Sequence, residues 1–262
     1  VLSLGIACTP SEPEVEETVS QKITATVVDN GSSVKWAKTD VIGVYTDASE
    51  NNVKYTTASA GASVSFTAAT EVKGAPMYAY YPYSTANASK KATGLVGELA
   101  QNQTAGVVNY MYGVQTGSNS AGDASFEFRP MFADVVFTVE TAGSVLEGQE
   151  IVSLTCKVTR NGADVPVVGS FTYSAADGSY SVQSGSAEFT TVSKAVVFPA
   201  VKAGDLLTVT AKSAEAEAVA ELTVEGEVVA GGYYPVTVVL PEAPVVEPEE
   251  PETPEEPETP VE

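Results

Sequence analysis

Apolar and polar residues alternate along most of the chain between Ser20 and Leu240. A period of two is the pattern of a β-strand with one buried face. The alternating segments are rich in Val, Ile, Thr and aromatic residues, and turn residues such as Arg160-Asn161-Gly162 separate them. The pattern predicts strands at residues 23–28, 41–46, 53–57, 63–67, 77–83, 126–128, 134–139, 151–158, 170–173, 179–182, 195–198, 206–211, 220–224 and 234–240.

Short strands at this spacing are typical of all-β sandwiches and barrels. A polar stretch at 84–97 interrupts the series, and a connector at 143–149 divides it into two runs. We therefore predict two consecutive β-sandwich domains, residues 21–144 and residues 145–240.

The segment 211–225 is rich in Ala and Glu and has an alternative reading as a helix. Its last part, Leu222-Thr223-Val224, alternates, and Gly226 and Gly231-Gly232 follow it. These features favour a β-hairpin.

The first residues form an apolar run that ends in Gly5-Ile6-Ala7-Cys8. This run resembles the lipobox of bacterial lipoproteins, where the signal is cut before a cysteine whose sulfur receives a diacylglycerol. Gly5 departs from the lipobox, which favours Leu at that place; a chance cysteine is the alternative. Residues 9–17 are rich in Pro and Glu and cannot pack a core, and acidic residues so placed resemble surface-export signals of Bacteroidota lipoproteins. We expect residues 1–20 to be a signal remnant and acidic tether, with lipid attached at Cys8.

The other end, residues 241–262, contains two copies of Pro-Glu-Glu-Pro-Glu-Thr. Prolines lack amide hydrogens and glutamates repel one another, so this segment is predicted to be a disordered, semi-extended linker and not a donor strand. Whether a further domain follows Glu262 stays open.

The charge and composition exclude several kinds of function. The chain has 34 acidic and 13 basic residues, a net charge of −21, which argues against nucleic-acid binding and against attraction to anionic lipid. It contains no histidine, which removes Ser-His-Asp and Cys-His nucleophiles and His-ligated zinc. We therefore expect no enzyme activity and no cofactor.

Two smaller features have structural explanations. Cys156 lies in an alternating strand on the same side as Leu154 and Val158, which predicts a small buried hydrophobic residue without a redox role. A calcium site could be formed by Asp47, Glu50, Asn51 and Asn52, but their spacing fits no known loop, and a solvated turn is favoured. No metal site is predicted.

Several phrases resemble a known family. The segment from Trp36 to Tyr45 is similar to the Trp-x-x-x-Asp-x-Ile-Gly-Val-Tyr/Phe signature of fimbrillin-like proteins, the type V pilus subunits and related surface lipoproteins of Bacteroidota. Further similar segments follow in the family's order, at residues 78–83, 101–103, 109–113, 126–137 and 230–240.

The resemblance implies two transthyretin-like Greek-key sandwiches in a lipoprotein of the outer membrane surface or of a fimbrium. In polymerising members a trypsin-like protease cuts after an arginine and removes the first strand, and the groove accepts a strand of the next subunit. Main-chain hydrogen bonds then provide affinity, and alternate side chains provide register. Expected partners are other fimbrial subunits or ligands on host or bacterial surfaces, with the membrane reached through Cys8.

The motif residues are predicted to have structural roles. Trp36 caps one sandwich, Asp40 anchors the turn into the next strand, and Gly43 allows close backbone approach. The other motif positions are Tyr78, Tyr80, Pro82, Phe126, Phe128 and Tyr234, and we expect Phe126, Phe128, Val136 and Tyr234 to point inward.

The aromatic run at 78–83 also permits a glycan-binding interpretation, with Tyr81 and Tyr83 as the contacts. Alternation places Tyr78 and Tyr80 on one face of the strand and Ala79 and Tyr81 on the other. Core packing is therefore favoured for at least half of them.

Two departures argue against a major fibre subunit: the Pro- and Glu-rich segment 241–262, which is no donor strand, and the positions of the arginines. The arginines are Arg129, which precedes Pro130, and Arg160 in a predicted hairpin, so none lies where a first strand would be released. Lys22 or Lys35 could serve a different protease. We therefore expect adhesion or an accessory role as an anchor or tip subunit. The alternatives are a glycan-binding surface lipoprotein of a polysaccharide-uptake system and the stalk of a longer enzyme.

Overall fold

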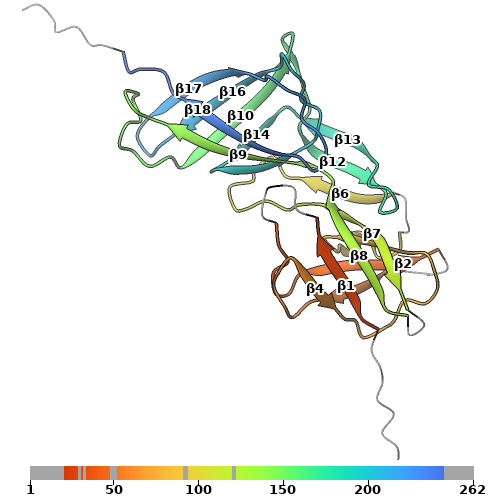
Figure 1. Ribbon diagram of the computed structural model, residues 1–262. Coiled ribbons are helices and arrows are strands. Elements are labelled where there is room, and N and C mark those ends of the chain that lie inside the picture. The colour runs from red at the N-terminus through yellow and green to blue at the C-terminus, as the bar shows by residue number, and fades with distance from the viewer. Residues whose placement is uncertain are drawn as a thin grey trace, which may run out of the picture.

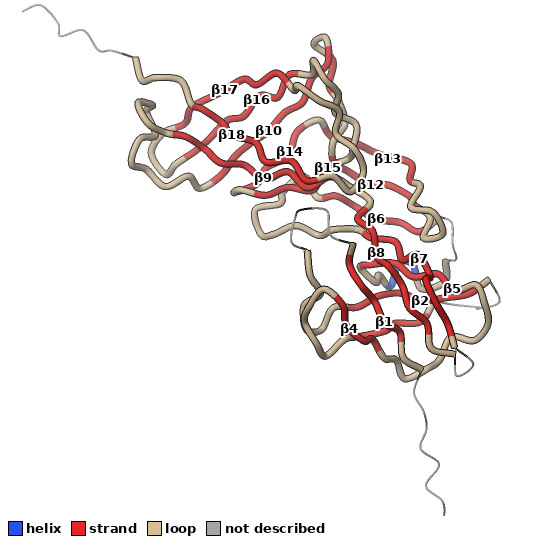
Figure 2. The backbone as a smooth tube through the Cα atoms, in the orientation of Figure 1, coloured by secondary structure: helices blue, strands red, loops and turns tan. Residues whose placement is uncertain are grey.

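The computed structural model describes residues 21–28, 31, 34–47, 52–90, 94–119 and 122–244. In these ranges the chain folds into strands β1 to β18 and one short 3-10 turn, η1 (Thr85–Asn87), so the prediction of an all-β protein is confirmed (Figure 2). No helix in the described ranges has the length and apolar character needed to cross a membrane.

The first half of the molecule is a seven-stranded sheet in the order β3-β2-β5-β7-β8-β1-β4. A bridge between Thr56 and Thr67, with N–H···O distances of 2.9 and 3.0 Å, connects the two edges, so the sheet curls around its own core. Its strands are β1 (Ile23–Val27), β2 (Val41–Thr46), β3 (Val53–Thr56), β4 (Ser63–Phe66), β5 (Met77–Tyr81), β7 (Met111–Ser118) and β8 (Ala124–Pro130).

The second half contains three smaller sheets. One has the order β11-β10-β16-β17 with β14 also on β10, the second is β13-β12-β6, and the third is β15-β9-β18. Their strands are β6 (Leu95–Leu99), β9 (Ala133–Glu140), β10 (Ser153–Arg160), β11 (Ala163–Asp164), β12 (Val168–Tyr173), β13 (Tyr180–Ser186), β14 (Glu188–Thr191), β15 (Lys194–Val197), β16 (Leu206–Lys212), β17 (Glu217–Thr223) and β18 (Tyr233–Val239).

The two halves are interleaved along the chain. β6 and β9 both precede the predicted boundary at 144/145, yet β6 pairs with β12, and β9 pairs with β15 and β18. Between them the chain returns to the first half as β7 and β8 (Figure 1). The side-chain amide of Gln103 adds a further link, because it donates to the carbonyl of Val196 (2.9 Å) and accepts from its amide (2.8 Å).

The sequence pattern did not reveal β6, β7, β14 or the two-residue strand β11. β6 begins within the polar stretch at 84–97 and ends just beyond it, and only its end residues Leu95 and Leu99 are buried. Its centre is Gly97, over which the rings of Phe171 and Tyr110 pack. The predicted hairpin is confirmed, because β16 and β17 pair antiparallel from Leu206–Thr223 to Lys212–Glu217.

The alternation of buried residues changes phase between β8 and β9. Phe126 and Phe128 are 1% and 0% exposed, as predicted, but Val135 and Phe137 fill the second core and Val136 is only partly buried. The inward prediction for Val136 was therefore wrong by one residue. The junction Met131-Phe132, itself buried, shifts the phase because β8 and β9 belong to different sheets.

Cys156 is fully buried between Leu154 and Val158, which also face the second core. Burial raises the pKa of its thiol to about 12, so the thiolate needed for redox chemistry is not formed near neutral pH. The prediction of a small buried hydrophobic residue is confirmed.

We expect the interleaved halves to unfold together. Trp36 is the single tryptophan and lies in the first half, so its fluorescence in a urea titration should show the same midpoint as far-UV circular dichroism, which reports all sheets. A fluorescence midpoint clearly apart from the dichroism midpoint would show that the halves unfold separately.

Candidate functional site

Strand β5 has both faces in apolar cores. Ala79 is in the core of the first half and Tyr81 packs against it. Tyr80 is in the core of the second half and Tyr78 packs against that core. The alternation predicted for this strand is therefore observed, and β5 forms a wall shared by the two halves.

Trp36 lies inside the first core and is 2% exposed. Its ring makes edge contacts with Phe66, Tyr81 and Phe128 at centroid distances of 5.0 to 5.3 Å. Its indole Nε1 donates to the carbonyl of Ala25 in β1 at 3.0 Å. Trp36 thus holds the first strand to the rest of the core.

Asp40 ties the turn before β2 to the aromatic strand. One carboxylate oxygen accepts from the amide of Ala37 at 2.7 Å, and the other accepts from the Tyr81 hydroxyl at 3.2 Å. Burial and the neighbouring Asp40 raise the pKa of Tyr81 to about 12. The hydroxyl therefore stays protonated and continues to donate to Asp40.

Gly43 leaves space for the ring of Tyr80. A Cβ at this position would lie 2.2 Å from Cε1 of that ring. The Tyr80 hydroxyl donates to Oδ1 of Asn52 at 3.0 Å, and its ring meets Tyr173 of the second half edge-on at 6.2 Å. Gly43 thereby permits one of the contacts that join the two halves.

The proposed calcium ligands are not gathered in the described part of the chain. Glu50 and Asn51 lie outside the described residues. Asn52 is buried and donates to the carbonyl of Asn87, besides accepting from Tyr80. Within the described ranges, no three acidic or cysteine side chains lie close enough together to hold a metal ion.

None of the aromatic side chains at 77–83 is freely exposed. Tyr81 and Tyr83 are partly buried. The ring of Tyr81 packs against Trp36, and its hydroxyl donates a hydrogen bond to Asp40. Pro82, after a cis peptide bond with Tyr81, is partly buried as well. The flat exposed aromatic pair that glycan stacking requires is not formed by this segment. Cys8, the predicted lipid attachment, lies outside the described residues.

The second half contains an apolar groove with a volume of about 470 Å³. It lies between the inner face of β9 and β18 and the inner face of β10, β16 and β17. Its lining residues are Val135, Phe137, Val158, Val167, Phe189, Val197, Val201, Leu207, Leu222, Thr223, Val224, Glu225, Gly226, Val228, Tyr234, Pro235, Val236 and Thr237.

The groove is closed at one end and open at the other. Ala218, Ala220, Val238 and Leu240 are buried at the closed end. Towards the open end the inward residues of the same two strands, such as Leu222 and Val236, are only partly buried. The two sheets therefore separate towards the loop between β17 and β18.

Both strands beside the groove are sheet edges. Gly232 and Leu240, at the two ends of β18, bond to Asp134 and Glu140 of β9. Because alternate residues of a parallel strand bond to the same neighbour, Thr237 and Val239 direct their backbone groups away from β9. The open edge thus offers main-chain donors and acceptors beside an apolar groove, although Pro235 contributes no donor.

Tyr234 is the motif residue that lies in this groove. It is partly buried, and its hydroxyl accepts from the amide of Val229 (2.8 Å) and donates to the carbonyl of Glu227 (3.3 Å), which fixes the loop at the mouth. Sequence reasoning missed the other groove residues, including Leu222, Val224 and Val228. Their alternation is visible, but it gives no sign that two sheets separate there.

We predict that Gly43→Ala lowers the free energy of unfolding by about 1–3 kcal/mol, because the new methyl group displaces the Tyr80 ring. Gly117→Ala in β7 is the matched control, since nothing lies near its added Cβ. Urea denaturation of both variants measures the effect, and equal stabilities would contradict the shared role of Gly43 and Tyr80.

Comparisons with known proteins agree with this geometry. The sequence profile of the fimbrillin-like family matches residues 24–253. The structure is similar to that of a "putative cell adhesion protein" from Bacteroides uniformis, with a TM-score of 0.57, 22% identity, and coverage of 84% of this chain and 92% of the other. A protein of the same description from Bacteroides ovatus gives a TM-score of 0.54 at 17% identity, with coverage of 84% and 91%. No curated protein sequence matches. With the aromatic motif strand in place and most of its length matched, the chain belongs to the fimbrillin-like family.

Proposed function

We propose that this chain is a cell-surface adhesin or an accessory subunit, an anchor or a tip, of a fimbria. It is tethered to the outer membrane by lipid on Cys8 and contacts other subunits by accepting a strand. The observation that carries the proposal is the open apolar groove between the free edges of β17 and β18.

The first strand supports an accessory role, because it is held inside its sheet. β1 is an interior strand of the seven-stranded sheet, between β8 and β4, and its alternate residues Ile23, Ala25 and Val27 are buried. No arginine lies between β1 and β2, although Lys35 and Lys38 are exposed. A trypsin-like protease that requires arginine would therefore leave β1 in place.

The groove suits an extended segment of another subunit. An added strand would bond to the free edge of β18 or β17, and every second side chain would enter the apolar groove. Glu225 at the rim disfavours an acidic residue in that strand.

Each half is proposed to be a transthyretin-like Greek-key sandwich, broadly residues 21–144 and 145–240, with β6 and β9 contributed to the second half.

The glycan-binding alternative is not favoured by any described residue of the aromatic strand. Tyr81 and Tyr83 are partly buried, and their rings contribute to the cores. We therefore retain adhesion through protein contacts as the proposed function.

Site-specific photocrosslinking on intact, fimbriated cells tests the acceptor groove. A photoreactive amino acid at Thr223, exposed at the rim of the groove, should crosslink to an extended segment of another fimbrial subunit, identified by mass spectrometry of the product. The same group at Ser181, exposed on the edge strand β13, should give no such product.

A filled groove provides the specificity control. Val236→Phe places a larger side chain in the groove and should abolish the crosslink from Thr223, whereas Val219→Phe on the exposed face of β17 should leave it unchanged. Equal products from Thr223 and Ser181, or no product from Thr223, would refute the acceptor site. Ladders of strand-exchanged oligomers after lysine-specific proteolysis would instead identify a major fibre subunit.

A further inference from the structure

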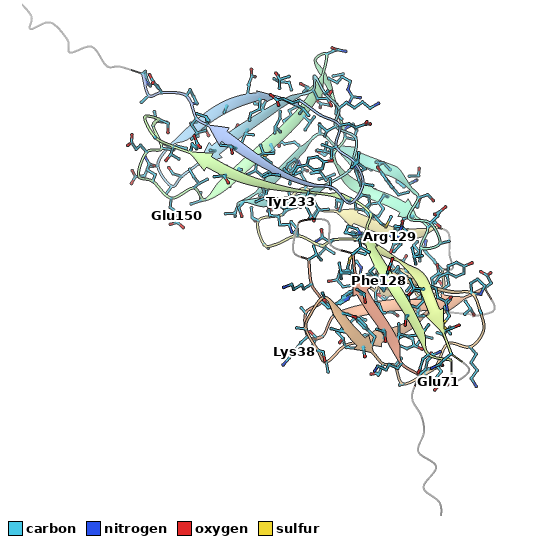
Figure 3. The ribbon with its side chains drawn as sticks, viewed as in Figure 1. Lys38, Glu71, Phe128, Arg129, Glu150 and Tyr233 are labelled. Atoms are coloured by element: carbon cyan, nitrogen blue, oxygen red, sulfur yellow. The ribbon has the colours of Figure 1, made fainter. Side chains whose placement is uncertain are left out.

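The described chain enters and leaves the molecule at opposite ends. β1 begins at the lower end of the first half, and β18 runs out at the far end of the second half (Figure 1). Glu71, beside the start of β1, and Glu150, near the end of β9, mark these two ends (Figure 3). The sequence continues beyond both, so tension between the tether and the C-terminal segment passes through β1 and β18.

Both of these strands pair in parallel with an interior neighbour. β1 lies parallel to β8 over five residue pairs, from Ile23–Ala124 to Val27–Phe128. β18 lies parallel to β9 over seven residue pairs, from Tyr233–Asp134 to Val239–Glu140. Bonds beyond the strands extend both pairs, from the Val28 amide to the carbonyl of Phe128 (2.9 Å) and from the Leu240 amide to the carbonyl of Glu140 (3.1 Å).

The two pairs are connected in series. β8 ends at Pro130 and β9 begins at Ala133, with Met131 and Phe132 between them. A pull on the start of β1 is opposed by β8, whose other end pulls on the start of β9. β9 in turn is opposed by β18, which is pulled from its end.

This geometry loads each parallel pair along its length. When two parallel strands are pulled from opposite ends, they must slide, and all hydrogen bonds of the pair resist together. When they are pulled from the same end, the bonds break one after another. Forced unfolding is governed by the rate of crossing the unfolding barrier, so loading many bonds together raises the force required.

The junction in this series is held on both sides. Met131 donates its amide to the carbonyl of Tyr110 at 2.8 Å. The ring of Phe132 packs against Phe171, Tyr180 and Phe198 at centroid distances of 4.7, 5.1 and 5.3 Å. The junction is therefore anchored in the second core and cannot act as a free hinge.

The entry of the chain is fixed by Gln21, which is 3% exposed. Its side-chain amide donates to the carbonyls of Val72 (2.8 Å) and Gly122 (2.6 Å), and its oxygen accepts from the amide of Val72 (3.0 Å) and from the Tyr55 hydroxyl. The next amide, of Lys22, donates to Asp123 at 2.7 Å. These bonds lie on the path of the load before the first parallel pair.

We propose that the chain is a load-bearing spacer, in which the pairs β1–β8 and β9–β18, connected in series, carry tension along their length. The inference needs a load at the two ends. It rests on the proposed surface anchor for the N-terminal end and on an attachment through the segment after β18 for the other, and it is independent of the acceptor groove. A surface protein built in this way keeps its fold while it holds a cell to another surface.

Single-molecule force spectroscopy of the purified full chain tests the proposal without any partner. All proteins carry Cys8→Ser, and the buried Cys156 does not react in the folded state. The chain is pulled either from its two termini or between the C-terminus and a Glu150→Cys attachment. Glu150 is exposed and lies in the connection between β9 and β10, so the second geometry pulls β18 away from its neighbours starting at one end and does not load the bonds of β9–β18 together.

The rupture force between the termini should be several-fold higher than the force from the Glu150 attachment, since only the first geometry loads the bonds together. Equal forces in the two geometries, or a weaker response between the termini, would overturn the proposal. Both measurements use folded protein, so the result does not depend on the success of a core variant.

A matched pair of variants tests the entry point. Gln21→Ala should lower the rupture force between the termini and leave the force from the Glu150 attachment unchanged. Gln183→Ala removes an exposed glutamine of β13, outside the path of the load, and should change neither force. If Gln21→Ala leaves the rupture force between the termini unchanged, Gln21 does not carry the load.

Discussion

A strand with both faces buried in apolar cores cannot shift without disturbing both, and β5 is such a strand. Ala79 and Tyr81 pack into the first core, whereas Tyr78 and Tyr80 pack into the second. The contact depends on Gly43, because only a residue without a side chain leaves space for the Tyr80 ring. Edge-to-face aromatic pairs such as Tyr80–Tyr173 add about 0.5–1.5 kcal/mol beyond their buried area. The relative position of the two halves follows from this shared wall.

The interleaving of the chain strengthens this constraint. β6 and the side chain of Gln103 attach a segment of the first half to the second half, and the chain then returns to complete the seven-stranded sheet. At the buried junction Met131-Phe132 the chain enters the second half for the second time. Such a molecule transmits force and position from one end to the other, which suits a protein that connects a cell to another surface.

Local pattern allowed the sequence to predict much of this structure. Strand positions, the hairpin at 206–223, the burial of Cys156 and the two faces of β5 all follow from a period of two. β6 was not predicted, because its centre is Gly97 and only its end residues are buried. The structural roles of Gln21 and Gln103 could not be predicted, because glutamine is usually exposed and their buried hydrogen bonds depend on partners far away in the sequence. The groove could not be predicted, because it depends on the separation of two sheets, and the residue pattern of a single strand contains no information about that separation.

The central claim is that the chain keeps its first strand and offers an open edge elsewhere. Hydrogen exchange of the purified protein, followed by mass spectrometry, tests both parts at once. We predict that the amides of β1 at residues 23–27 exchange only through global unfolding, while those of Thr223, Glu225, Thr237 and Val239, which point away from the neighbouring strands, exchange quickly. Rapid exchange of β1 together with protection of the groove edges would contradict the account and indicate a subunit that releases its first strand.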